Sequence, residues 1–106
     1  MRYFKLEDFN CRETGKNEMS EEFLEKLDEL RHKCGFPFII TSGYRDPTHS
    51  IEARKAKAGT HARGIASDIQ INNGNEAYQI IKNAQSMGFN GIGVAKSFIH
   101  VDIRKG

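Results

Sequence analysis

The sequence predicts an α+β fold in which a small, largely antiparallel sheet is flanked by helices. Two segments carry apolar residues at helical spacing, and three others have the composition or alternation of strands. These elements do not follow the regular strand–helix–strand order of a parallel sheet. The chain of 106 residues can bury one core but has no room for a second module, so residues 1–106 are expected to form a single domain.

Two amphipathic helices are predicted, at residues 20–35 and 75–88. The first begins at Ser20, a residue typical of the N-cap, and ends at Gly35, a residue typical of the position after the last turn. The second ends at Gly88 in the same way. Apolar residues recur every three or four positions in both segments, so each helix has one face to bury against the core.

Three strands are predicted. Residues 36–45, "FPFIITSGYR", are rich in aromatic and β-branched residues and are bounded by a proline and a glycine. Residues 64–71, "GIASDIQI", and 97–104, "SFIHVDIR", alternate with a period of two, so each has one buried face. Residues 50–59 are expected to form a short, highly charged helix.

Composition and charge argue against several classes of partner. The net charge is +2, and no basic block is interleaved with aromatic residues, so a nucleic-acid partner is not expected. No apolar run approaches the roughly 20 residues of a membrane helix, and the first ten residues lack the apolar core of a signal peptide. The two cysteines match neither a CxxC nor a zinc-finger spacing and are expected to be free or buried thiols. A monomer is the default expectation.

The two alternating strands separate ionisable from aliphatic side chains. In residues 64–71 and in residues 97–104, the aliphatic residues share one face and the ionisable residues share the other. A histidine also lies in the turn that leads into the first of these strands. If the strands are neighbours, the polar groups converge. They are His61, Asp68, His100, Asp102 and Arg104.

Two histidines and an aspartate can bind zinc. Catalytic zinc sites use three protein ligands and leave the fourth position to water, and His61, Asp68 and His100 would make such a set. Asp102 lies two residues beyond His100 on the same face, which suits a carboxylate beside the water better than a fourth ligand. Such a carboxylate can take a proton while the water attacks an amide, so hydrolysis of a peptide bond is expected.

The same residues also allow structural roles. His61 could cap its turn, and Asp68 could pair with Arg63 or Arg104. His100 could lie on the polar face of a half-exposed strand. The spacing of the residues does not by itself decide between these roles and a metal site.

A resemblance to a known family extends over nearly the whole chain. The order of "SGYR", "GTHARGIASD" and "GIGVAKSFIHVDIR" is similar to that in zinc peptidases of the D-alanyl-D-alanine carboxypeptidase type, the peptidase M15 family, which includes small phage endolysins. In that family a Ser-x-His-x-x-Gly-x-Ala-x-Asp core supplies two ligands, and a histidine near the C-terminal end supplies the third. The matching ligands here are His61, Asp68 and His100, with Ala58 or Gly59 where the family often has serine.

The resemblance also implies which residues contact the substrate. The arginine of the family's SGYR segment binds substrate and helps to polarise the scissile carbonyl, which points to Arg45. His49 resembles a histidine that recurs after this segment and is expected on the substrate side or in a structural role. Arg104 is expected to bind substrate, and either arginine could anchor a terminal carboxylate.

The chain departs from the family at the catalytic acid. Many members place an acidic residue three positions before the last ligand, where this chain has Ser97. The subgroup that ends in His-x-Asp-x-Arg is more similar, so Asp102 is expected to act as the general base. The alternative is that Asp102 holds His100 in orientation, in which case the water needs another acceptor.

The resemblance implies a fold shared with the hedgehog signalling domain and peptidoglycan stem peptides as substrate. The expected activity is that of a carboxypeptidase releasing terminal D-Ala or of an endopeptidase cutting between L-Ala and D-Glu. The alternative function is a non-catalytic, zinc-stabilised module of a virion or cell-wall-binding protein, in which the metal only supports folding. A cell-wall substrate without an export signal fits a phage lysin released through a membrane lesion, or a chain that lacks its leader.

Overall fold

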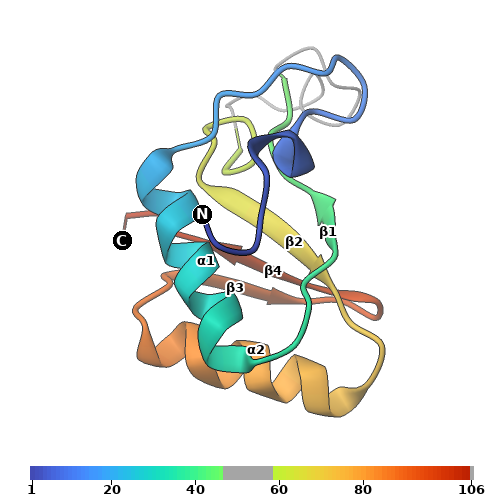
Figure 1. The fold of residues 1–106 in the computed structure, drawn as a ribbon, viewed down its shortest axis with the longest axis vertical. Coiled ribbons are helices and arrows are strands. Elements are labelled where there is room, and N and C mark those ends of the chain that lie inside the picture. The colour runs from blue at the N-terminus through green and yellow to red at the C-terminus, as the bar shows by residue number, and fades with distance from the viewer. Residues whose placement is uncertain (47–58, 106) are drawn as a thin grey trace.

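The computed structural model of the protein describes residues 1–46 and 59–105 and contains a four-stranded antiparallel sheet with the strand order β1-β2-β4-β3 (Figure 1). This agrees with the predicted α+β fold. His49 and residues 50–58 of the predicted charged helix lie outside the described residues. The strands are β1 (Ile40–Ser42), β2 (Ala66–Gln70), β3 (Gly91–Val94) and β4 (Phe98–Asp102).

Both predicted helices are present, as α1 (Glu21–Cys34) and α2 (Gly74–Ser86). The Ser20 side chain accepts a hydrogen bond from a backbone N–H of the first turn of α1, and Gly35 ends the helix in the left-handed conformation with φ of 76°. The side chain of Asn73 caps α2 in the same way as Ser20 caps α1. No helix in the described part of the chain is long and apolar enough to cross a membrane.

The core lies between the two helices and one face of the sheet. Apolar side chains from α1, α2 and the two central strands form a single buried cluster. Each fully buried aliphatic side chain in such a cluster contributes about 1.5–3 kcal/mol through removal from water. The opposite face of β2 and β4 carries polar side chains, as the alternation predicts. The core includes Leu27, Leu30, Ile69, Ile80, Ile99 and Val101.

Two strands differ from the sequence-based prediction. The strand expected over residues 36–45 is limited to β1, because the chain leaves the sheet at Gly43 to pass against Phe9. A Cβ at Gly43 would approach the Cα of Phe9 to less than 3.0 Å, so glycine permits this contact. Strand β3 was not predicted, because its sequence, Gly-Ile-Gly-Val, contains two residues that disfavour strands. Its pairing with β4 provides the hydrogen bonds that its composition does not predict.

Candidate metal centre

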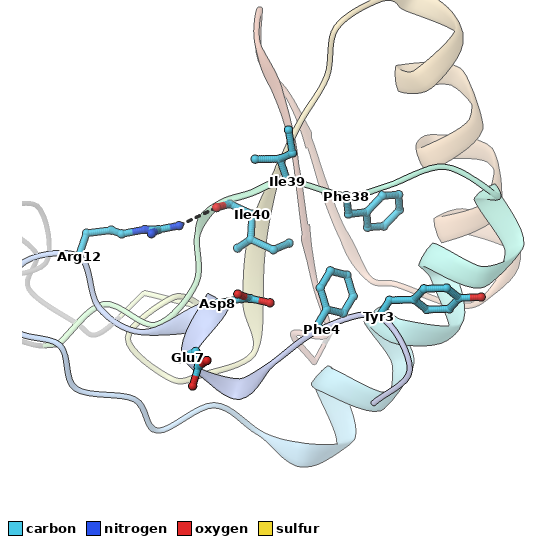
Figure 2. Close-up of a pocket in the computed structure, with 8 residues that line it drawn as sticks. All are labelled: Tyr3, Phe4, Glu7, Asp8, Arg12, Phe38, Ile39 and Ile40. Carbon is cyan, nitrogen blue, oxygen red and sulfur yellow. Dashed lines mark hydrogen bonds between the residues drawn. The ribbon is translucent and has the colours of Figure 1, made fainter.

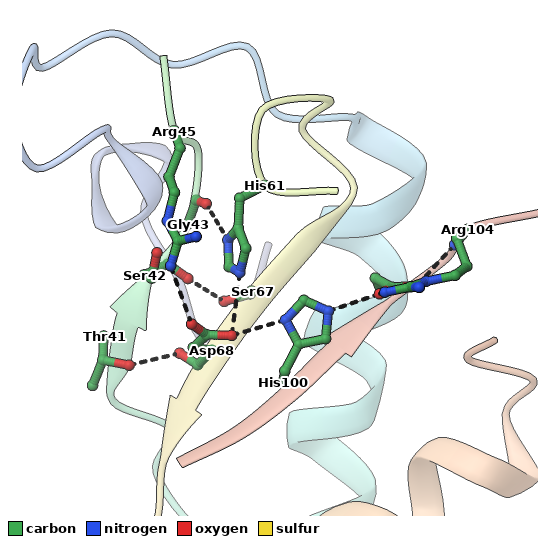
Figure 3. A network of polar contacts seen from close by, with 10 residues as sticks. Thr41, Ser42, Gly43, Arg45, His61, Ser67, Asp68, His100 and Arg104 are labelled. Atoms are coloured by element: carbon green, nitrogen blue, oxygen red, sulfur yellow. Dashed lines mark hydrogen bonds and ion pairs between the residues drawn. The ribbon is translucent and has the colours of Figure 1, made fainter. Parts of the chain in front are cut away.

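Three residues that sequence analysis singled out come together on the polar face of the sheet (Figure 3). Asp68 in β2 is the direct antiparallel partner of His100 in β4. His61 lies in the turn before β2 and reaches over the same face. One ligand atom from each of the three residues lies within 4.8 Å of the others. The pairing of β2 with β4 is therefore what brings the two strand residues together.

The turn that carries His61 is held in place by close backbone contacts. Gly64 adopts a φ of 72°, and a Cβ there would collide with the backbone of Glu18, so only glycine fits. The backbone N–H of Arg45 donates to the carbonyl of His61 at 3.2 Å. The His61 ring is buried as a result of this packing.

Both imidazole rings are anchored through one nitrogen and present the other to Asp68. Nδ1 of His61 lies 2.8 Å from the carbonyl oxygen of Gly43, which can only accept, so this nitrogen carries the proton. Nε2 of His61 then faces Oδ1 of Asp68 at 3.3 Å. In His100 the roles of the nitrogens are exchanged: Nε2 lies 2.7 Å from Oδ2 of Asp102, and Nδ1 lies 2.9 Å from Oδ1 of Asp68.

The electrostatics keep Asp68 ionised. Burial raises the pKa of its carboxyl group, but the hydrogen bonds and charges of His100 and His61 outweigh burial and hold the pKa well below its ordinary value. For His100, burial lowers the pKa, while Asp68 and Asp102 raise it by a larger amount. The site therefore presents a buried anion whose neighbours already compensate for its charge. A divalent cation could take a place between this carboxylate and the imidazole nitrogens that face it.

The donor set fits a zinc ion. Two imidazole nitrogens and one carboxylate oxygen are common zinc ligands, and tetrahedral coordination at about 2.0–2.1 Å separates ligand atoms by about 3.3 Å. The two separations from Oδ1 of Asp68, 3.3 Å to His61 and 2.9 Å to His100, are close to this value. Three protein ligands leave one coordination position for water or substrate. His61, Asp68 and His100 could thus hold a catalytic rather than a closed structural metal.

Comparison with known families agrees with this chemistry. The sequence model of the Peptidase M15 family matches residues 2–102, which include all three candidate ligands. The chain belongs to the peptidase M15 family. Peptidases of this family depend on zinc, so membership indicates a metallopeptidase acting on a peptide-like substrate. No curated protein and no solved structure matches the chain.

In this member of the family, Asp102 at the end of β4 is fully buried, with 0% of its surface exposed. Its Oδ1 accepts from the backbone N–H and Nε of Arg104, and its Oδ2 accepts from Nη2 of Arg104 and from His100. Burial raises the pKa of Asp102, but the hydrogen bonds from Arg104 outweigh it and lower the pKa to about 2. Gly91 is the cross-strand partner of Asp102, and a Cβ at this position would overlap the carboxylate.

Two residues of the SGYR segment have different roles: Arg45 faces the metal centre, whereas Tyr44 packs in the interior. Nη2 of Arg45 lies 3.8 Å from Oδ2 of Asp68, and the side chain is 17% exposed. Tyr44 is buried, and its hydroxyl donates to Glu18 at 2.8 Å. Burial and the hydrogen bond to Glu18 raise the pKa of Tyr44 to about 12, so its hydroxyl stays protonated. These contacts give Tyr44 a structural role.

Two surface depressions differ in their relation to the metal centre. One of about 280 Å³ adjoins His100 and is lined by β3 and Arg104. A larger one, of about 370 Å³, lies beside β1 and shares none of its lining residues with the centre (Figure 2). There Nη2 of Arg12 donates to the carbonyl of Ile40 at 2.6 Å, which occupies part of the strand edge. Of these two, the smaller depression lies next to a candidate metal ligand.

Two contributors to the site were not singled out from the sequence. Gly43 acts through its backbone carbonyl, which no residue pattern reveals. Gly91 acts through the absence of a side chain above Asp102. A glycine inside a strand can indicate close approach by another group, but this signal requires that the strand be recognised first.

Proposed function

We propose that the protein is a zinc-dependent peptidase that hydrolyses peptidoglycan stem peptides, with Nε2 of His61, Oδ1 of Asp68 and Nδ1 of His100 as metal ligands. The observation that carries the proposal is that each histidine is anchored through one nitrogen while its other nitrogen converges on the same carboxylate oxygen. Membership in the peptidase M15 family supports the reaction class.

The surrounding residues keep the ligands ready to bind. When bound, zinc would lower the pKa of its water to about 7 and polarise the scissile carbonyl. The carbonyl of Gly43 keeps the proton of His61 on Nδ1, which leaves Nε2 for the metal. The carboxylate of Asp102 binds Nε2 of His100, which leaves Nδ1 of that ring for the metal. Fewer rearrangements are then needed when the metal enters.

We assign to Asp102 the second of the two roles considered for it, orientation of His100. Both of its oxygens are occupied by donors from Arg104 and His100, and the carboxylate is fully buried. A general base must be within hydrogen-bond reach of the water it deprotonates and must have a pKa suited to accepting the proton. The pKa of about 2 at Asp102 and its occupied lone pairs favour a positioning role over that of a base.

Arg45 is proposed to bind the substrate beside the metal. Its positively charged side chain is partly exposed next to Asp68. In this position it can donate hydrogen bonds to the scissile carbonyl as negative charge develops on the oxygen. The substrate-side role of His49 stays a prediction from the sequence.

The proposal is tested by digesting purified peptidoglycan with zinc-loaded protein and identifying the released products by mass spectrometry. Release of single alanines means carboxypeptidase activity, and stem peptides with a free N-terminal glutamate mean endopeptidase activity. The matched control is Asp68→Asn, which keeps the side-chain shape and removes the charge that binds the metal. A wall left unchanged by folded, zinc-loaded protein would contradict the proposal and favour the zinc-stabilised binding module.

A further inference from the structure

The depression beside His100 includes two glycines of β3 in its lining. It is lined by Asn90, Gly91, Ile92, Gly93, His100 and Arg104. Gly91 and Gly93 are the cross-strand partners of Asp102 and His100 and lie on the same face of the sheet as the metal centre. A Cβ at Gly93 would come within 3.3 Å of the Cβ of His100, so a longer side chain there would extend over the depression.

Arg104 forms one wall of this depression and has donors available. Its Nε and Nη2 bind the carboxylate of Asp102, while the side chain as a whole is 51% exposed. A guanidinium has five N–H groups, and Nη1 of Arg104 bonds to none of the residues that the structure describes. The carbonyl of Arg104 accepts from the side chain of Asn90, which ties the two walls together. The available N–H groups suit a planar anion such as a carboxylate.

The charges around the depression favour an anion. The carboxylates of Asp68 and Asp102 are matched by the guanidinium groups of Arg45 and Arg104. A divalent metal at the His-Asp-His group therefore leaves the site with net positive charge. An anionic group entering between the metal and Arg104 would be attracted from both sides.

The spacing between Arg104 and the metal ligands corresponds to about one residue of substrate. The path from Nδ1 of His100 to Nη2 of Arg104 crosses the imidazole ring and then two hydrogen bonds. These two hydrogen bonds meet at Oδ2 of Asp102 and measure 2.7 Å to His100 and 2.6 Å to Arg104. One extended residue spans about 3.3–3.6 Å, so the carboxylate of the residue after the scissile carbonyl lies about that far from it. A charge-assisted hydrogen bond adds about 2.8 Å, which gives a reach comparable with this path.

We propose that this depression is the subsite for the residue that follows the cleaved bond, and that Arg104 selects substrates in which this residue carries a free α-carboxylate. The inference rests on the proposed function and deepens it. Two stem-peptide bonds meet the requirement. In D-Ala-D-Ala the carboxylate is the C-terminus, and in L-Ala-D-Glu it is the α-carboxylate of a glutamate that is linked onward through its side chain.

The test uses two pairs of synthetic stem peptides with zinc-loaded protein. One pair ends in D-Ala-D-Ala with a free or an amidated C-terminus, and the other contains L-Ala-γ-D-Glu with a free or an amidated α-carboxylate. We expect cleavage in at least one pair, with kcat/KM about 10- to 100-fold higher for the free carboxylate, as for loss of a charged hydrogen bond. The pair that is cleaved identifies the source of the carboxylate.

Variants then assign the preference to a residue. Arg104→Gln should abolish the preference for the free carboxylate, whereas Arg45→Gln should slow both members of a pair and keep the preference. If Arg104→Gln is too slow to assay, calorimetry on the zinc-loaded variant shows whether the free peptide still binds more tightly than the amidated one.

The outcomes separate the two levels of the proposal. Equal cleavage of free and amidated peptides by the wild-type protein, or a preference that persists in Arg104→Gln, overturns the role of Arg104 while the peptidase activity stands. Cleavage of neither pair by zinc-loaded wild-type protein overturns the proposed function and the subsite with it.

Discussion

Replacement of Gly91 by alanine tests whether Asp102 positions His100. A Cβ at residue 91 would lie less than 3.0 Å from both carboxylate oxygens of Asp102. To regain an ordinary separation, the carboxylate must retreat by roughly 1 Å. Its 2.7 Å hydrogen bond to His100 would then exceed the limit of about 3.5 Å for such a bond. We expect zinc affinity to fall about 10- to 100-fold, equivalent to about 1.4–2.7 kcal/mol.

The assay is a competition titration of zinc between the protein and a chromophoric chelator at constant pH. Circular dichroism checks that the variant is folded, since crowding at a buried position also lowers stability by about 1–3 kcal/mol. The control is Gly74→Ala at the start of α2, where a Cβ would meet nothing within 4 Å. A folded Gly91→Ala protein with wild-type zinc affinity would refute the proposed link from Gly91 through Asp102 to His100.

Three further predictions concern Asp102 and Asp28. Asp102→Asn should weaken zinc binding, measured by chelator competition, and should also slow peptide hydrolysis. Loss of hydrolysis at unchanged zinc affinity would instead indicate that Asp102 is the general base. Asp28, which accepts from the backbone N–H groups of Arg2 and Tyr3, should stabilise the fold by about 1–3 kcal/mol relative to Asp28→Ala in urea unfolding. Burial raises the pKa of Asp28, but the hydrogen bonds from Tyr3 and Arg2 lower it by more. The pKa in the folded protein therefore lies below the ordinary value of 3.8. The stabilisation by Asp28 is complete above the pKa of its carboxyl group in the unfolded chain and is lost as the pH falls through its pKa in the folded protein. The difference in free energy of unfolding between the wild-type protein and Asp28→Asn should therefore shrink on acidification. A difference that stays constant with pH would contradict the assignment.

The sequence predicted those parts of the fold that depend on local patterns. Both helices have caps and stripes that act over a few residues, and the alternation in β2 and β4 separates the isoleucines from Asp68 and His100. Strand β3 was not predicted because its two glycines disfavour a strand, and its pairing with β4 is not visible in the local sequence. Pairing between distant segments therefore decided what local propensity could not.

The site was predictable to a similar extent. The type and spacing of His61, Asp68 and His100 point to a metal, but which nitrogen of each ring faces Asp68 depends on acceptors elsewhere in the chain. The contacts of Asp102 likewise depend on how Arg104 folds back onto it, which the sequence pattern does not contain. Residue identities thus indicate the ligands, and tertiary contacts decide the roles of the groups around them.

The measurement that tests the central claim most directly is the zinc K-edge absorption spectrum of the zinc-loaded protein, with its metal content. The proposal predicts one zinc ion per chain with only nitrogen and oxygen neighbours at about 2.0–2.2 Å, including two imidazoles. Asp68→Asn should lose most of the metal. The two free thiols, Cys11 and Cys34, offer the competing chemistry. A sulfur neighbour at about 2.3 Å, or undiminished zinc in Asp68→Asn, would contradict the His-Asp-His site.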